Sequence, residues 1–203
     1  MQPTHCHIVV LISGNGSNLQ ALIDASVSSN FKISAVISNK SDAFGLQRAE
    51  RDNIPALVIN HKDFSSREEF DLALIKTIDE ITPDLIVLAG FMRILGSEFV
   101  SHFAGRIINI HPSLLPKYPG INTHQRALEA GDKEHGVTVH FVDETYDTGK
   151  IIAQRCIDIS DVSSPEEISE RVLAVEHELL PYVIEKFALD KIIVGHDRVK
   201  VLP

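Results

Sequence analysis

Short apolar stretches rich in β-branched residues alternate, in the first half of the chain, with longer stretches in which apolar residues recur three and four positions apart. The first pattern is typical of buried β-strands and the second of amphipathic helices. Strands and helices that alternate in this way form a parallel sheet with helices on its faces. The predicted strands of this half cover residues 7–13, 32–38, 56–60, 84–90 and 106–110.

Two long helices are predicted most clearly, and each begins with the spacing of a capping box, a serine followed three residues later by a glutamate. Ser66 and Glu69 begin the first helix, which Pro83 ends. Ser164 and Glu167 begin the second, with a proline at its first helical position. The apolar residues expected to face inward are Phe70, Ala73, Leu74, Ile78 and Ile81 in the first helix, and Ile168, Val172, Val175, Leu179 and Val183 in the second.

The second half of the chain has a different pattern. A loop rich in Pro and Gly follows residue 110, then a short helix ending near residue 131, and then two strand-like stretches, 136–142 and 150–159. We expect antiparallel or mixed strands here. The whole pattern predicts an α/β fold, with a doubly wound, mostly parallel open sheet and helices on both faces. Because we find no repeat or linker, we expect one domain, residues 1–203, with halves of approximately 1–100 and 101–203.

Charge and cysteine content limit the classes of function. The formal net charge is −9 and no run of five or six like charges occurs, which argues against sequence-independent binding of nucleic acid or of an acidic membrane surface. The two cysteines lack the spacing of a metal site or a disulfide framework, and the apolar run 8–12 is too short for a membrane span. We expect a cytoplasmic protein without a bound metal, and interpret His5, Cys6 and His7 as a frayed leader before a strand.

A glycine-rich loop, Gly14-Asn15-Gly16-Ser17-Asn18, is predicted between the first strand and the first helix. Backbone N–H groups and the positive end of the helix dipole favour an anion there. A dinucleotide fingerprint would need a glycine at position 19, which is Leu19, and a P-loop would need Gly-Lys-Ser/Thr. The loop therefore predicts a site for a phosphate monoester, with tight capping of the helix as the alternative.

The stretch IINIHPSLLP places two polar residues at the end of an apolar strand. Asn109 and His111 are two residues apart, so they share one face of the strand, and Pro112 ends its pairing. A carboxamide can stabilise an oxyanion and an imidazole can move a proton, so the pair suits acyl transfer. No Gly-x-Ser-x-Gly elbow occurs, which indicates that the nucleophile belongs to a substrate. The alternative is that both side chains merely hold a loop.

A histidine that transfers protons is commonly oriented by a carboxylate. The loop VDETYDTGKI offers three, Asp143, Glu144 and Asp147. Spacing alone does not choose among them.

Six motifs in order resemble the phosphoribosylglycinamide formyltransferase family: VVLISGNGSNLQALI, VISNKSDAFGLQRA, FMRIL, NIHPSLLPKYPG, GVTVHFVDE and D-T-G. The resemblance covers nearly the whole chain. It implies transfer of the formyl group of 10-formyltetrahydrofolate to the amine of 5-phosphoribosylglycinamide in de novo purine (IMP) biosynthesis, with no metal. It also implies a Rossmann-like phosphate-binding first half and a formyl-folate and catalytic second half.

The resemblance also implies the site residues. The catalytic residues would be Asn109, His111 and Asp147, which selects one acid from the three. The substrate-binding residues would be Gly16, Ser17 and Asn18 for the phosphate, with Leu173 and Glu176 on the last helix. The folate-binding residues would be Arg67, Met92, Arg93, Ile94, Leu95, Asn109, Asp143 and Asp147; without the resemblance, Met92, Ile94 and Leu95 would be interpreted as core residues beside a turn.

One position departs from the family pattern. Lys150 follows Asp147-Thr148-Gly149, where family members commonly have proline, so we expect a freer loop.

Three other functions remain alternatives. A methionyl-tRNA formyltransferase or a formyltetrahydrofolate hydrolase would need a further domain, for which we expect no room in this chain. A nucleotide-binding sensor function would not explain the motifs NIHPSLLP and D-T-G. We therefore expect small-molecule partners only, and a monomer or homodimer.

Overall fold

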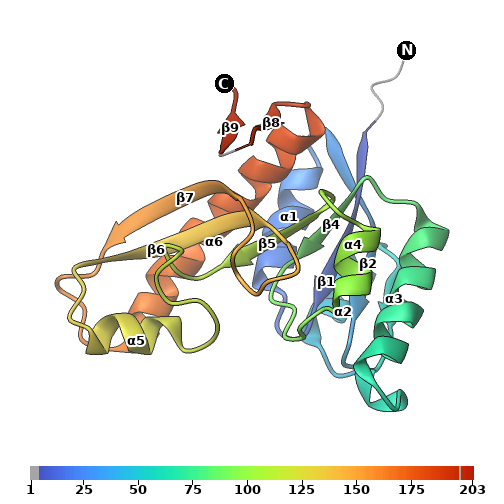
Figure 1. Cartoon of the computed structure of the whole chain (residues 1–203), viewed down its shortest axis with the longest axis horizontal. Coiled ribbons are helices and arrows are strands. Elements are labelled where there is room, and N and C mark those ends of the chain that lie inside the picture. Colours follow the sequence, from blue (N-terminus) through green and yellow to red (C-terminus); the bar gives the residue numbers. More distant parts are fainter. Residues whose placement is uncertain (1–4, 197) are drawn as a thin grey trace. The chain divides into compact units, whose positions relative to one another are not determined.

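The computed structural model describes residues 5–196 and 198–203. These residues form two compact units, one ending at Ile108 and the other beginning at Asn109. Each unit has its own helices and strands (Figure 1).

The first unit contains parallel strands whose sequences are almost wholly apolar. They are β1 (Cys6–Ile12), β2 (Phe31–Ser38), β3 (Ala56–Val58) and β4 (Leu85–Leu88), arranged in the order β3-β2-β1-β4. In the middle of the sheet Val10 pairs with both Val36 and Val87. The predicted parallel strands are confirmed, although β3 is shorter than the predicted stretch 56–60.

The helices of the first unit follow from this strand order. The chain runs outward from β1 to β3 and then returns to the other side of β1 with β4. Since crossovers between parallel strands are right-handed, this reversal places the helices before β3 on one face and the helix before β4 on the other. Accordingly α1 (Ser17–Ser26) contacts α2 (Phe44–Arg51), and α3 (Arg67–Ile81) contacts α4 (Ser97–His102), as Figure 1 shows for the second pair. A 3-10 turn, η1 (His61–Asp63), precedes α3. The predicted doubly wound arrangement is confirmed.

The second unit has mixed strand directions, as predicted. The strand β5 (Ile107–His111) contains the boundary between the units, and β6 (Glu134–Phe141) pairs in antiparallel fashion with β7 (Ile151–Asp158). The long helix α6 (Pro165–Ala188) packs on β6 and β7 and on α5 (Thr123–Glu129). A short antiparallel hairpin, β8 (Ile192–Val194) and β9 (Val199–Val201), was not predicted.

The two predicted capping boxes form only in part. Ser66 accepts a hydrogen bond from the N–H of Glu69 at 3.2 Å, as predicted, but the Glu69 carboxylate accepts from the N–H and hydroxyl of Ser65. Ser164 caps α6 in the same way, and the glutamate there accepts from the N–H of Ser163. Each helix therefore has its serine cap, with the reciprocal bond displaced by one residue toward the N-terminus.

The predicted inner face of α6 needs one correction. Ile168, Val172, Leu179 and Val183 are buried as predicted, but Val175 is only half-buried and Glu176 beside it is buried. Burying a carboxylate in an otherwise apolar face costs free energy unless the group has a partner, so Glu176 differs from the apolar residues around it. In α3, Phe70, Leu74 and Ile78 are buried, whereas Ala73 and Ile81 are half-buried.

Candidate active site

Every residue of β5 except Asn109 is buried. Ile108 and Ile110 are buried, Asn109 is half-buried, and His111 is buried at the end of the strand. The second unit begins within this strand, so Asn109 and His111 belong to that unit.

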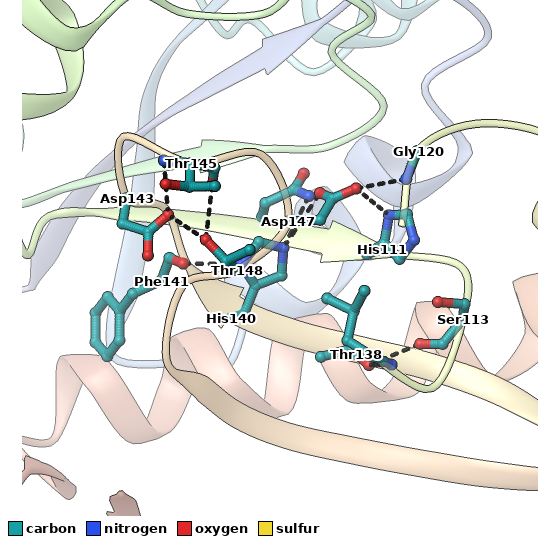
Figure 2. A network of polar contacts seen from close by, with 12 residues as sticks. His111, Ser113, Gly120, Thr138, His140, Phe141, Asp143, Thr145, Asp147 and Thr148 are labelled. Carbon is teal, nitrogen blue, oxygen red and sulfur yellow. Dashed lines mark hydrogen bonds and ion pairs between the residues drawn. The ribbon is translucent and has the colours of Figure 1, made fainter. Parts of the chain in front are cut away.

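Asp147 is the acid that faces His111. Its Oδ2 atom lies 3.4 Å from His111 Nδ1, and both side chains are almost wholly removed from solvent. The same carboxylate oxygen accepts a hydrogen bond from the N–H of Gly120 at 2.8 Å, which anchors it to the loop after β5 (Figure 2). The pairing that the resemblance implied is therefore present in the structure, whereas spacing along the chain had left three acids open.

The second nitrogen of His111 also has a partner. Nε2 lies 2.9 Å from the carbonyl oxygen of Tyr118, and because a carbonyl can only accept, Nε2 carries the proton of this hydrogen bond. Both ring nitrogens therefore face an acceptor. A neutral imidazole can donate to only one of them, while an imidazolium can donate to both.

His140, on β6, is a member of this group that sequence analysis missed. Its Nε2 atom lies 3.2 Å from Asn109 Nδ2. The same atom lies 3.8 Å from Asp147 Oδ1 (Figure 2). Burial lowers the pKa of this histidine, with smaller effects from its neighbours, so the neutral form is favoured near pH 7. The available signal was a histidine at an otherwise buried position of the strand-like stretch GVTVHFV.

The loop that carries Asp147 is held by its own residues. Asp143 Oδ1 accepts from the N–H of Thr145 at 3.1 Å and from the hydroxyl of Thr148 at 3.0 Å. Gly149 approaches the backbone so closely that a Cβ atom there would overlap the carbonyl oxygen of Phe141. The D-T-G motif thus contains the acid and the glycine that lets its loop close on β6.

Lys150, which follows the D-T-G motif, has a partner far away in the chain. Its Nζ atom donates to the carbonyl oxygen of Gly195 at 2.7 Å, just after β8. The expectation of a freer loop rests on the missing proline ring and stays a prediction beside this side-chain bond. Because Lys150 is exposed, the bond stabilises the loop only modestly, by about 1 kcal/mol or less.

The glycine-rich loop lies in the first unit and depends on a left-handed glycine. Gly16 precedes α1 with φ of 74°, and a Cβ atom there would lie 2.8 Å from the Cα atom of Gly45 on α2. The N–H of Gly45 also donates to the carbonyl oxygen of Gly14 at 3.0 Å. The loop therefore packs directly against the first turn of α2, which places Ser17 and Asn18 at the start of α1.

Arg48, also on α2, fixes the same loop and was not recognised from the sequence. Its guanidinium donates to the carbonyl oxygen of Asn15 at 2.9 Å and to the Asn15 side-chain oxygen at 3.0 Å. A third bond goes to Gln20 at 3.1 Å, and the guanidinium lies over the ring of Phe44. This rigid, multiply bonded arginine holds the loop from the side of α2.

The predicted folate loop, residues 92–95, is not part of the core. The side chains of Met92 and Ile94 are 71% and 57% exposed, which excludes the core interpretation for these two residues. Arg93 and Leu95 are half-buried. Exposed apolar side chains gathered in one loop are a feature of ligand-binding surfaces.

Both ends of this loop are anchored within the first unit. The N–H of Met92 donates to the hydroxyl of Ser13, at the end of β1, at 2.7 Å. The N–H of Gly96 donates to the buried carboxylate of Asp71 at 2.7 Å. Arg67 lies near the same end, since a Cβ atom on Gly96 would be 3.7 Å from its Nε atom. The loops after β1 and β4 thus meet at the point where the strand order reverses, which is where open α/β sheets bind ligands.

The remaining predicted substrate residues are Leu173 and Glu176, on α6 in the second unit. They are three residues apart, so they lie on one side of the helix, with Glu176 buried and Leu173 half-buried.

Cys6 and His7 are part of β1, contrary to their interpretation as a frayed leader, and His5 precedes the strand. Cys6 begins β1 and is buried, and His7 Nδ1 lies 3.0 Å from the hydroxyl of Ser34. Among residues 5–196 and 198–203, no group of three or more His, Cys, Asp or Glu side chains could hold a metal ion. None of the helices in that part of the chain is long and apolar enough to cross a bilayer.

Residues 6–184 match the family model described as formyl transferase. The chain therefore belongs to the formyl transferase family, and it is an enzyme of the one-carbon transferase class.

The relatives of this chain show which formyl transferases it is similar to in sequence and structure. The chain is 54% identical to phosphoribosylglycinamide formyltransferase of Escherichia coli, over 90% of this chain and 87% of that protein. The solved structure of phosphoribosylglycinamide formyltransferase from Coxiella burnetii has a TM-score of 0.92 and 52% identity, covering 97% of this chain and 93% of the other. The human trifunctional purine biosynthetic protein adenosine-3 is 45% identical over 94% of this chain, which spans 19% of that protein. The predicted resemblance is confirmed.

Proposed function

We propose that this chain transfers the formyl group of 10-formyltetrahydrofolate to the amine of 5-phosphoribosylglycinamide, giving the N-formyl product and tetrahydrofolate in purine biosynthesis. The names of the relatives support the choice of substrates. The observation that carries the chemistry is the contact of His111 Nδ1 with Asp147 Oδ2 at 3.4 Å, with Asn109 on the same strand face as His111.

The reaction needs an oxyanion stabiliser and a route for one proton. The amine of the acceptor attacks the formyl carbon, and the new C–N bond converts the formyl oxygen to an oxyanion. An N–H of Asn109 stabilises that oxyanion. When the intermediate collapses, the bond between the formyl carbon and the folate nitrogen breaks, and the proton lost by the amine is delivered to that nitrogen.

His111 assists this proton movement, and Asp147 stabilises the imidazolium that forms. Because the Nε2 proton is donated to Tyr118 O in this structure, proton exchange at Nε2 requires the reacting groups to replace that carbonyl. No metal or prosthetic group takes part in these steps.

The binding residues are also part of the proposal. Gly16, Ser17 and Asn18 bind the substrate phosphate through the start of α1, and the left-handed Gly16 supports this role. Leu173 and Glu176 contact the rest of that substrate. The folate is bound by Arg67, Met92, Arg93, Ile94, Leu95, Asn109, Asp143 and Asp147; the exposure of Met92 and Ile94 supports this assignment.

We also propose a cytoplasmic location and a monomeric or homodimeric state. Cys6 and Cys156 are free thiols, which suits a reducing compartment. Sedimentation of the purified protein measures the oligomeric state.

An absorbance assay tests the reaction. Loss of the formyl folate is followed with and without glycinamide ribonucleotide. We expect consumption only when the ribonucleotide is present, with one N-formyl product per folate consumed. Equal consumption in both samples would favour a formyl folate hydrolase. Tight nucleotide binding by calorimetry without any formyl transfer would favour a sensor protein.

A further inference from the structure

His140 has a defined protonation pattern that follows from its partners. Its Nδ1 atom lies 2.8 Å from the carbonyl oxygen of Phe141, and a carbonyl can only accept a hydrogen bond, so Nδ1 carries a proton. In a neutral imidazole the other nitrogen, Nε2, then has a lone pair and no proton. The buried side chain of His140 thus presents an acceptor to its neighbours.

This acceptor determines which way the Asn109 carboxamide is turned. Asn109 Nδ2 lies 3.2 Å from His140 Nε2. If the carboxamide were rotated by half a turn, its oxygen would face the Nε2 lone pair, and two acceptors would oppose each other without a proton between them. The torsion that turns a carboxamide is intrinsically broad and nearly two-fold, so a neighbour has to choose the orientation.

The orientation matters for the reaction because a carboxamide has two N–H bonds on one nitrogen. With one of them donated to His140, the second remains free to serve an oxyanion. In the opposite orientation the carbonyl oxygen would occupy that place and repel the developing charge. A preorganised donor is what makes oxyanion stabilisation effective.

We propose that His140 is a positioning residue for the formyl transfer: its unprotonated Nε2 accepts one N–H of Asn109 and so directs the other N–H to the oxyanion. This proposal rests on the proposed function, since it assigns Asn109 to the oxyanion.

The proposal requires a neutral His140. The ionisable groups facing it are Asp147, His111 and Asp143. Burial is the largest effect on its pKa and lowers it, and the positive charge of His111 acts in the same direction, while the two carboxylates and the bond to Phe141 oppose them. If His140 were protonated, Nε2–H would face Asp147 Oδ1, 3.8 Å away, and Asn109 would lose its acceptor.

A double-mutant cycle tests the role. His140→Leu removes the acceptor and keeps an apolar, buried side chain. We expect its kcat to fall about 10 to 100-fold with the KM for folate changed less than about three-fold, since the loss cannot exceed that of an oxyanion donor. In the Asn109→Ala background the same change is expected to cost less than about three-fold, because a residue that acts through Asn109 has nothing left to position.

Two further variants complete the cycle. His140→Gln offers a carbonyl oxygen as acceptor and is expected to recover part of the lost kcat. His135→Leu removes another buried histidine of β6, one bonded to His124 and Pro112, and its effect on kcat is expected to be the same in the wild-type and Asn109→Ala backgrounds. An equal loss from His140→Leu in both backgrounds, or no loss in either, overturns the proposal.

A spectroscopic measurement keeps the proposal testable even if His140→Leu does not fold. Nitrogen-15 correlation spectra of the wild-type protein, labelled in histidine, report which ring nitrogen of His140 is protonated. We expect the proton on Nδ1 at pH 7.5, and a proton on Nε2 overturns the proposal. This result does not depend on substrate, so a protein that shows the expected tautomer but no formyl transfer would contradict the proposed function and not the placement of Asn109.

Discussion

The carboxylate of Asp147 and the imidazole of His111 are in direct contact, with Nδ1 and Oδ2 3.4 Å apart, and only 5% of the His111 side chain and 4% of the Asp147 side chain are exposed. Charges in such a site are screened little by solvent, so an imidazolium formed at His111 during the reaction would interact strongly with the Asp147 carboxylate. The pair therefore couples the D-T-G loop to the proton transfer proposed for His111.

Asp147→Asn is predicted to lower kcat about 100-fold or more, because the amide keeps the shape of the carboxylate and cannot stabilise the imidazolium. The measurement is kcat and kcat/KM across pH 5 to 9. Glu144→Gln is the matched control, since it changes an exposed acid of the same loop and is expected to stay within about three-fold of wild type. Equal losses in the two variants would indicate an effect of net charge on the loop and contradict the specific role of Asp147.

Asn109→Ala is predicted to lower kcat by about 100 to 1,000-fold, the usual consequence of removing an oxyanion donor. Folate binding is expected to change less, because the donor acts mainly in the transition state. Steady-state kinetics with a separate measurement of folate affinity distinguishes the two effects. Turnover near the wild-type rate would show that the oxyanion is stabilised elsewhere.

Gly16→Ala is predicted to raise the KM for the phosphorylated substrate about ten-fold or more. An alanine at φ of 74° is strained, and its Cβ atom would lie 2.8 Å from the Cα atom of Gly45, so the loop must shift. Gly14→Ala is the matched control, because a Cβ atom there meets nothing within 4 Å. Kinetics of both variants against each substrate provide the test, and similar KM values would contradict the assigned phosphate site.

The two hydrogen bonds from Arg48 to Asn15 lead to a related prediction. Arg48→Met is expected to raise the KM for the phosphorylated substrate several-fold with little change in the KM for folate, because the loop loses two bonds that fix its backbone and side chain. Arg51→Met removes an exposed arginine from the same helix and controls for net charge. If both variants raise that KM equally, the effect is electrostatic and the hydrogen bonds from Arg48 to Asn15 are not required.

Local patterns in the sequence predicted the parts of the structure that depend on local geometry. The alternation in IINIH correctly placed Asn109 and His111 on one face of β5, and the strands β1 to β4 follow directly from their apolar runs. The serine caps of α3 and α6 form as the spacing predicted. These features are set by residues within a few positions of each other.

The features that local patterns could not predict depend on residues far apart in the chain. Asp147 reaches His111 only because the β6–β7 hairpin returns its loop to β5, and spacing contains no information on that return. The partners of His140 and Arg48 are likewise 31 and 33 positions away. The bond from Lys150 to Gly195 joins residues 45 positions apart, which a local pattern does not indicate.

A pH-dependent loss of stability is predicted from His135. Burial is the main cause that lowers the pKa of this histidine to about 4 in the folded chain, with the charge of neighbouring His124 as the next contribution. Its pKa in the unfolded chain is about 6.5. As the pH falls below about 6.5, the unfolded chain therefore takes up a proton that the folded chain does not, and the free energy of unfolding decreases.

The full contribution of His135 is present above about pH 6.5 and is lost progressively as the pH falls toward 4. The loss would reach at most about 3.5 kcal/mol, since the two pKa values differ by about 2.5 units and each unit corresponds to about 1.4 kcal/mol. His135→Gln removes the titrating group and keeps hydrogen-bonding capacity, so its unfolding free energy should decrease less between pH 7 and pH 4.5. Urea denaturation of both proteins at several pH values in this range measures the difference. If the unfolding free energies of the two proteins fell equally with pH, His135 would be protonated in the folded chain as readily as in the unfolded one. That result would contradict the prediction, which rests on the burial of His135 beside His124.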